Sequence, residues 1–133
     1  MRPPAEPLSL RWLMTVHVIL VKRYGGGIGV RDVGLIDSAL HRPLTSYRGE
    51  YKYKTAFARA GALWVALIRN HGFVDGNKRT ATAAMTRWLL AEGYRLKSDQ
   101  DQLVDAAVAI ANKHLDEAGA AKWLETHSKR VRR

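Results

Sequence analysis

The residues best suited to chemistry fall in one short segment, which reads His71-Gly72-Phe73-Val74-Asp75-Gly76-Asn77-Lys78-Arg79-Thr80. A histidine can take a proton from a hydroxyl group, because a neutral imidazole is available near physiological pH. A carboxylate such as that of Asp75 can hold Mg²⁺ together with phosphate oxygens. Lys78 and Arg79 add two positive charges a few positions later. A base, a metal ligand and cations in one segment are what phosphoryl transfer requires.

This segment lies between two stretches whose apolar patterns predict the most buried helices of the chain, over residues 54–70 and 77–92. The free amides at the start of the second helix, together with the positive end of its dipole, form an anion-binding site. Two cations at a helix start are normally slightly unfavourable. Lys78 and Arg79 therefore indicate that an anion, such as phosphate, occupies this site.

Other residues of the segment fit the same interpretation. Gly72 and Gly76 permit tight turns and a close approach of the backbone to a ligand. Asp75 and Asn77 are good N-cap residues for the second helix. We expect Phe73 to insert into the core and fix the loop.

Each of these residues also has a purely structural interpretation. A histidine at a helix end can hydrogen-bond the last carbonyls of that helix, and Asp75 can serve only as a cap. Lys78 and Arg79 can be ordinary surface charges. The functional interpretation is favoured because one short loop contains all of these features.

The rest of the chain predicts helices that must position this segment. Leu10, Leu13, Val16 and Leu20 recur at helical spacing and predict the inward face of a first helix, which ends at the glycines after Tyr24. Asp32 can cap a helix over 33–41, Ser98 one that ends near 112, and Asp116 a last one. We expect residues 43–53 to form a loop or flap with a short hairpin. The fold class is all-α: a compact single-domain bundle of about six helices over residues 1–133, with a basic tail at 129–133.

Several further patterns carry weaker information. No strand precedes the glycines at 25–29, which therefore predict a helix stop rather than a phosphate loop. The remaining histidines lack metal-ligand spacing and are interpreted as structural or surface residues: His17, His41, His114 and His127. The tyrosines of the flap could stack on a base or could pack, and the sequence leaves both open: Tyr47, Tyr51 and Tyr53.

Composition narrows the class of protein. The chain has 133 residues, a formal net charge of +10 and no cysteine, which excludes disulfides and thiolate metal sites. It lacks an apolar run long enough for a membrane-spanning helix and the pattern of a signal peptide, so we expect a cytoplasmic protein with no membrane association. The charge favours anionic partners. Because the charge is spread along the chain, direct nucleic-acid binding is not expected.

The segment HGFVDGNKRTA resembles the signature of the Fic/Doc family. The Fic branch reads roughly HPFxxGNGRxxR, and the Doc branch, which is closer, reads HxFxDxNKRTA. Residues 23–40, with Arg-Tyr-Gly-Gly at their start, also look like Doc. The resemblance covers most of residues 10–95 and implies the compact helical fold of that family.

The resemblance also implies roles for matching positions. His71 would be the base that activates a target hydroxyl, Phe73 the loop anchor and Asp75 the Mg²⁺ ligand. The phosphates would be held by four consecutive residues: Gly76, Asn77, Lys78 and Arg79. Lys78 stands where Fic adenylyltransferases have a second glycine, and in Doc-like proteins this change accompanies a reversed nucleotide and transfer of the γ-phosphate. Lys78 and Arg79 would thus join His71 as catalytic residues.

By this resemblance the chain would be a Doc-like toxin of a toxin–antitoxin pair. It would transfer the γ-phosphate of ATP, with Mg²⁺, to a hydroxyl, expected to be a threonine, of a translation factor such as elongation factor Tu, and so inhibit translation. No self-inhibiting helix is evident, so inhibition would come from an antitoxin of the Phd kind with an acidic flexible segment. Two alternatives remain open: a Fic-like adenylyltransferase, which Gly76 favours because some Doc proteins have alanine there, and a non-enzymatic basic module that binds nucleic acid or a partner. The missing distal arginine of the Fic motif, at Ala83, favours the Doc branch.

Overall fold

The computed structural model describes residues 3–131, and its helices confirm the predicted all-α class. In chain order the helices are α1 (Leu10–Tyr24), α2 (Val33–His41), the short 3₁₀ turn η1 (Arg42–Leu44), α3 (Ala56–Asn70), α4 (Asn77–Ala91), α5 (Gln100–Ala111) and α6 (Glu117–Thr126). Two small antiparallel sheets accompany them: β1 (Ser46–Tyr47) with β2 (Glu50–Tyr51), and β3 (Tyr94–Leu96) with β4 (Ser128–Arg130).

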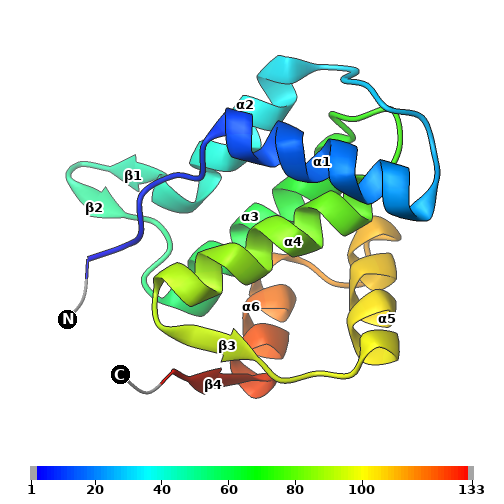
Figure 1. The fold of residues 1–133 in the computed structure, drawn as a ribbon. Helices are drawn as coiled ribbons and strands as arrows, with labels where there is room; N and C mark the ends of the chain where they lie inside the picture. The colour runs from blue at the N-terminus through cyan, green and yellow to red at the C-terminus, as the bar shows by residue number, and fades with distance from the viewer. Residues whose placement is uncertain (1–2, 132–133) are drawn as a thin grey trace.

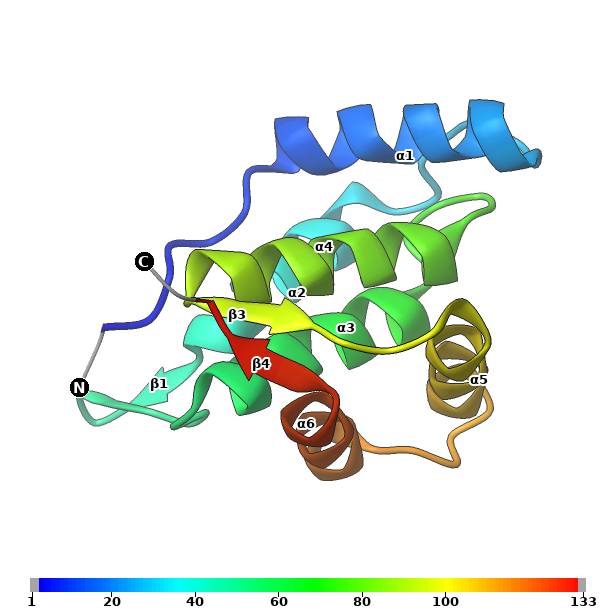
Figure 2. The ribbon, with the colours of Figure 1, turned by 60° about the horizontal axis from the view of Figure 1, so that its bottom comes forward.

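Helices α3 and α4 lie side by side in the centre of the molecule, with α1 and α2 on one side and α5 and α6 on the other (Figures 1 and 2). This arrangement follows from hydrophobicity, because α3 buries residues on nearly every side. The core centres on two fully buried tryptophans, Trp64 of α3 and Trp88 of α4. The loop that joins α3 to α4 is therefore held between the two best-packed helices.

The helix starts show how far local sequence signals reach. The side chains of Asp32 and Asp116 accept hydrogen bonds from the first turns of α2 and α6, as predicted. The expected cap of α5, Ser98, was wrong by one residue: Asp99 caps α5 in a reciprocal box with Gln102. A carboxylate followed three positions later by glutamine satisfies two amides at once, which Ser98 cannot do.

The buried face of α1 differs from the predicted one. The residues with buried side chains are Leu13, His17 and Val21, at steps of four. Leu10 and Leu20 are only half-buried, and Leu20 lines a surface groove instead. The prediction placed only apolar residues inward and so overlooked that the inward face passes through a histidine.

The expected flap is a β1–β2 hairpin whose base is fixed to α6. The phenol of Tyr53 donates to both carboxylate oxygens of Glu117, at 2.9 and 2.8 Å, and the guanidinium of Arg42 donates to them at 3.1 and 3.3 Å. Burial and the hydrogen bond to Glu117 raise the pKa of Tyr53 to about 12, so the phenol stays protonated and donates. Tyr53 is thus a packing residue.

The hairpin lies at the opposite end of α3 from the loop over residues 71–76, in both ribbon views (Figures 1 and 2). The fifteen residues of α3 separate them, which corresponds to about 22 Å. Tyr47 and Tyr51 are exposed at that distant end. At that distance we expect neither tyrosine to contact a ligand bound at the start of α4.

The C-terminal residues do not begin a free basic tail at 129. Lys129 and Arg130 belong to β4, which pairs with β3 in the register Arg95 to Lys129. Arg132 and Arg133 lie outside the described residues. In the described part of the chain, every helix is too short or too polar to cross a membrane.

Candidate active site

The loop between α3 and α4 begins at His71, which ends α3 in a left-handed conformation with φ 49° and ψ 47°. A residue with a side chain adopts this conformation at an energetic cost. The turn directs the chain away from α3, and the His71 side chain is exposed. Its Nδ1 lies 3.5 Å from Nδ2 of Asn77, so the imidazole lies beside the start of α4.

Phe73 and Asn77 fix the loop from inside. Phe73 is buried, and its ring stacks on the imidazole of His17 with the centroids 4.0 Å apart. The Asn77 side chain accepts a hydrogen bond from the Phe73 amide and donates one to the Phe73 carbonyl, both at 3.0 Å. Asn77 is itself buried and makes no N-cap contact, so its side chain holds the loop closed.

The first turn of α4 presents an anion-binding arrangement without a side-chain cap. The N-cap residue is Gly76, whose φ of 75° favours glycine, and neither Asp75 nor Asn77 caps the helix. The Thr80 amide donates to the Gly76 carbonyl at 2.9 Å. The amides of Asn77, Lys78 and Arg79 have no acceptor within residues 3–131. These amides can therefore bind an anion at the positive end of the helix dipole.

Asp75 is oriented by the glycine loop that follows α1, a contact that the sequence did not reveal. The Gly27 amide donates to Asp75 Oδ2 at 2.6 Å. The Val74 amide donates to the Gly29 carbonyl at 3.0 Å, and Val30 bridges to Phe73. Gly25 ends α1 as predicted, and its amide donates a hydrogen bond to the Val21 carbonyl. The glycine loop therefore does more than stop a helix: it also holds the loop that carries the candidate site.

Asp75 can hold a magnesium ion only together with phosphate oxygens as further ligands. Asp75 is exposed and uses one carboxylate oxygen for Gly27, which leaves the other oxygen for a metal. The described residues contain no group of three or more His, Asp or Glu side chains placed to hold a metal ion. Mg²⁺ is commonly bound by one or two carboxylates, with phosphate oxygens and water completing its shell. The donor set here matches that mode.

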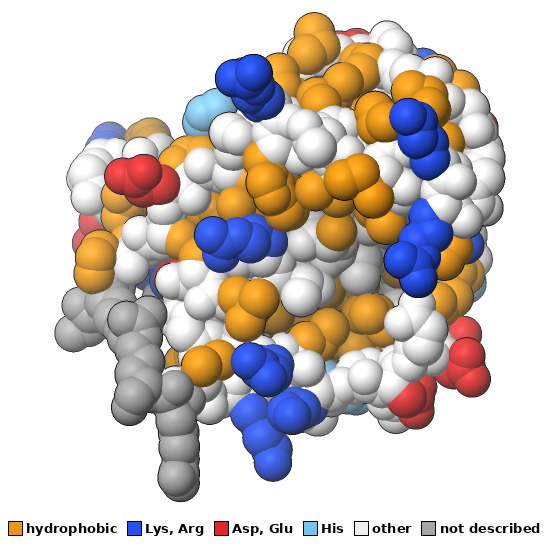
Figure 3. All heavy atoms as spheres, viewed as in Figure 1, with side chains coloured by type: hydrophobic (Ala, Val, Ile, Leu, Met, Phe, Trp, Pro, Cys, Tyr) orange, Lys and Arg blue, Asp and Glu red, His pale blue; other side chains and the backbone are white. Residues whose placement is uncertain are grey.

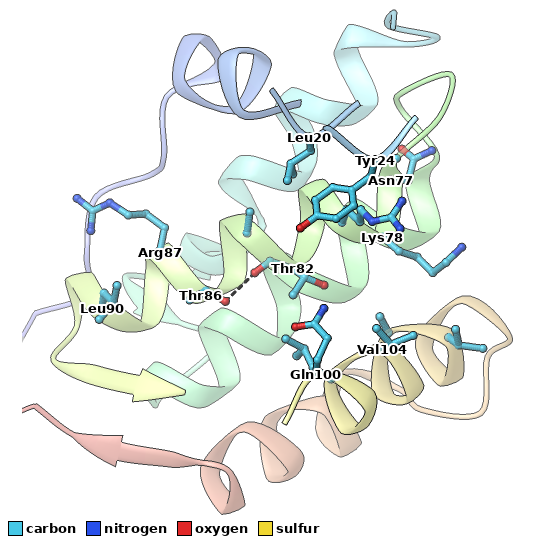
Figure 4. A pocket seen from close by; sticks show the side chains of 16 residues that line it. Leu20, Tyr24, Asn77, Lys78, Thr82, Thr86, Arg87, Leu90, Gln100 and Val104 are labelled. Atoms are coloured by element: carbon cyan, nitrogen blue, oxygen red, sulfur yellow. Dashed lines mark hydrogen bonds between the residues drawn. The ribbon is translucent and has the colours of Figure 1, made fainter. Parts of the chain in front are cut away.

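The two cations after Asn77 take different positions. Lys78 is exposed and lines one end of a groove to which Tyr24 also contributes (Figure 4). The Arg79 guanidinium lies over the ring of Tyr24, 4.5 Å from its centroid. Stacking on an aromatic face fixes the guanidinium plane while leaving its N–H donors available. Both cationic side chains thus extend from the first turn of α4, whose amides are free.

The groove runs along α4 from this point and has a volume of about 700 Å³. In the close-up, Thr82 and Thr86 of α4 form one wall, and Gln100 and Val104 of α5 face them (Figure 4). Val104 is about half exposed. The space-filling view shows basic side chains around hydrophobic ones on this face, with acidic groups toward its edges (Figure 3). The face therefore offers apolar surface beside positive charge.

The predicted site residues thus occupy one place in the structure: His71, Phe73, Asp75, Gly76, Asn77, Lys78 and Arg79. Their chemical roles stay predictions. Sequence reasoning missed His17 and the Gly27 amide as neighbours of the site. A histidine inside the apolar periodicity of the first helix was the available signal for His17.

The comparisons with known proteins agree with this geometry. A model described as the Fic/DOC family matches residues 7–89. A protein named Toxin Doc from Mycolicibacterium smegmatis is 43% identical over 90 residues, which are 68% of this chain and 68% of that protein. A protein named Protein kinase doc from Escherichia phage P1 is 30% identical over 118 residues, which are 88% of this chain and 91% of that protein. The chain belongs to the Fic/DOC family.

Proposed function

We propose that the chain is a Doc-like toxin that transfers the γ-phosphate of ATP to a hydroxyl group of a protein. The observation that carries the proposal is the set of free amides at Asn77, Lys78 and Arg79, with two cations and the exposed His71 imidazole at the same loop. A triphosphate is the anion that such an arrangement suits. The relative named a protein kinase supports phosphoryl transfer.

The chemical step balances with these groups. The oxygen of the target hydroxyl attacks the γ-phosphorus while the bond from that phosphorus to the β,γ-bridging oxygen breaks, and ADP leaves. His71 takes the proton of the hydroxyl. The amides and the side chains of Lys78 and Arg79 hold the charged oxygens in place. Mg²⁺, held by Asp75 and phosphate, would neutralise part of the triphosphate charge.

Lys78 favours this proposal over its alternative. A lysine at the second residue of α4 occupies space and supplies a charge where a glycine would leave room for more of the nucleotide. We take this as support for binding of the γ-phosphate. Gly76, in its left-handed conformation, is equally suited to an adenylyltransferase, which would transfer AMP through the same His71 and Asp75.

Label transfer separates the two reactions. The protein is incubated with Mg²⁺ and with ATP that is labelled at either the α- or the γ-phosphate. Each reaction contains a possible target as probe: elongation factor Tu in one set, and bacterial cell extract in the other. We expect label on a protein from the γ-position only, and none with His71→Ala. Label from the α-position only would establish the adenylyltransferase, and no His71-dependent label in either probe would contradict both. Lys78→Gly should abolish the kinase reaction but leave an adenylyltransferase active.

The groove along α4 supports an antitoxin of the Phd kind as partner. It combines apolar wall residues with three basic ones, Lys78, Arg79 and Arg87. An acidic segment that folds on binding would match both features. Val104→Glu should weaken binding of such an antitoxin by about tenfold or more, measured by calorimetry. Val33→Glu is the matched control, because Val33 is similarly exposed but lies on α2 outside the groove; equal affinities in the two variants would place the antitoxin elsewhere.

A further inference from the structure

His17 is fully buried in the middle of α1, directly beneath the candidate site. Its ring stacks on Phe73 at an interplanar angle of 19°. A Cβ atom on Gly76 would lie 3.9 Å from His17 Nδ1, so the imidazole also adjoins the N-cap of α4. The anion-binding turn therefore rests on a histidine that has no access to solvent.

Both ring nitrogens of His17 face groups that belong to the site. Nε2 lies 3.5 Å from the Gly29 amide, and Nδ1 lies 3.4 Å from the Thr80 hydroxyl oxygen. An amide can only donate, so Nε2 accepts, and in a neutral ring Nδ1 then carries the proton and donates to Thr80. Burial lowers the pKa of His17, which favours this neutral form.

The contacts of His17 belong to three separate segments. Gly29 is in the glycine loop, whose Gly27 amide orients Asp75. Phe73 is the anchor of the loop that carries His71, and Thr80 is in the first turn of α4. One imidazole thus joins the backbone that aims the carboxylate, the loop that carries the base and the turn that presents the free amides.

We propose that His17 is a positioning residue that sets the geometry of the anion site by holding the glycine loop, Phe73 and Thr80 together. The inference rests on the proposed nucleotide binding. A phenylalanine at position 17 could keep the ring stack but would leave the Gly29 amide and the Thr80 hydroxyl without a partner. Packing and positioning can therefore be separated by substitution.

The test measures binding of MgATP by calorimetry to the wild type, His17→Phe and Thr80→Val. We expect a loss of affinity of about tenfold for His17→Phe and a smaller loss for Thr80→Val, because each removes buried polar contacts. Thr15→Val is the control, since Thr15 is an exposed threonine on α1, the helix that carries His17. Thermal unfolding shows which variants are folded, and Thr80→Val, which preserves shape, decides the case if His17→Phe does not fold.

A second measurement, on the unmodified protein, tests the hydrogen bonds of the His17 ring rather than its packing. Nitrogen-15 NMR of the histidine rings should show His17 protonated at Nδ1, and its signals should shift when MgATP binds. His127, which stacks on Trp123 at the end of α6, should not shift. If the wild type binds MgATP and both variants bind it with the same affinity as the wild type, the role of His17 is contradicted and the proposed function is not. The same holds if the wild type binds MgATP without a shift of the His17 signals. A wild type that does not bind MgATP would overturn the proposed function and this inference with it.

Discussion

The Gly27 amide donates a hydrogen bond of 2.6 Å to the Asp75 carboxylate, although the two residues are 48 positions apart in the sequence. The contact joins the loop after α1 to the loop before α4. It leaves one oxygen of Asp75 free and fixes the direction of that oxygen. The glycine loop therefore has a role in the site that its glycine content alone does not disclose.

Adding a methyl group to this loop tests that role. A Cβ on Gly26 would lie 3.0 Å from the Cβ of Asp75, whereas a Cβ on Gly25 would meet nothing within 4 Å. Both glycines have positive φ, 110° at Gly26 and 93° at Gly25, so an alanine is strained at either position. We expect Gly26→Ala to weaken MgATP binding about tenfold more than Gly25→Ala, because only the first displaces the carboxylate. Equal affinities, measured by calorimetry, would contradict the coupling.

Asp75→Asn separates the position of this side chain from its charge. The amide oxygen of asparagine can still accept from Gly27, so the loop should stay in place and thermal stability should change little. A neutral side chain is a poor Mg²⁺ ligand. We therefore expect nucleotide binding to lose its dependence on Mg²⁺ in this variant. A dependence equal to that of the wild type would remove Asp75 as the metal ligand.

The contrast between predicted and observed contacts has a physical explanation. Periodic hydrophobicity and caps such as Asp32 act within a few residues, so the helices could be predicted from the sequence. The site loop could be predicted because its unusual residues are contiguous. The Gly27–Asp75 contact depends on how the loop after α1 lies against the loop before α4, and no local pattern encodes that packing. The inward position of His17 follows the four-residue spacing of Leu13 and Val21, but its contacts with the site loop do not. Asn77 was predicted as a cap of the second buried helix, but Gly76 is the N-cap and the Asn77 side chain holds Phe73, which a capping preference alone does not predict.

The backbone of His71 predicts a trade-off between stability and activity. Its left-handed conformation is one that asparagine tolerates better than histidine. We expect His71→Asn to leave the free energy of unfolding unchanged or raise it by up to about 1 kcal/mol, while label transfer is abolished. Lys113→Asn is the matched control, because Lys113 has a similar φ of 62° far along the chain, and it should retain activity. A large loss of stability in His71→Asn would instead assign His71 a structural role.

The Glu117 carboxylate predicts a pH dependence of stability. Burial alone would raise the pKa of Glu117, but the hydrogen bonds from Arg42 and Tyr53 outweigh it and hold the pKa below the ordinary value of 4.5. A carboxyl group with a lower pKa in the folded state stabilises the fold fully above its unfolded pKa, and this stabilisation is lost as the pH falls through the folded value. Glu117→Gln should therefore flatten the acid side of the stability curve below about pH 4.5.

The size of this effect is limited because the Arg42–Glu117 pair is partly solvated. We expect a difference of no more than about 1 kcal/mol near neutral pH, measured by urea unfolding at several pH values. Glu125→Gln on the same helix is the control, since Glu125 is exposed. If both variants follow the same pH profile, the carboxylate at 117 does not anchor the hairpin.

The buried pair of Arg59 and Glu92 joins α3 to α4 at the end remote from the site loop. Arg59 donates to Glu92 through two nitrogens and to the Tyr53 carbonyl at 3.0 Å, and the Trp88 indole also donates to Glu92. Removing one partner of a buried pair leaves an uncompensated charge. We expect Arg59→Met to lower the free energy of unfolding by about 3–5 kcal/mol, against less than about 0.5 kcal/mol for the exposed Arg11→Met.

A double variant distinguishes the charge from the packing. Arg59→Met with Glu92→Gln leaves a neutral amide that can still accept from Trp88 and needs no counter-charge. The double variant should therefore be more stable than Arg59→Met alone, with a coupling free energy of about 1 kcal/mol or more in urea unfolding. Additive losses would mean that the cost lies in the cavity left by the arginine. In either case the MgATP affinity of the folded fraction should equal that of the wild type, because the anion site lies at the other end of the helix pair and is held by contacts that neither substitution touches.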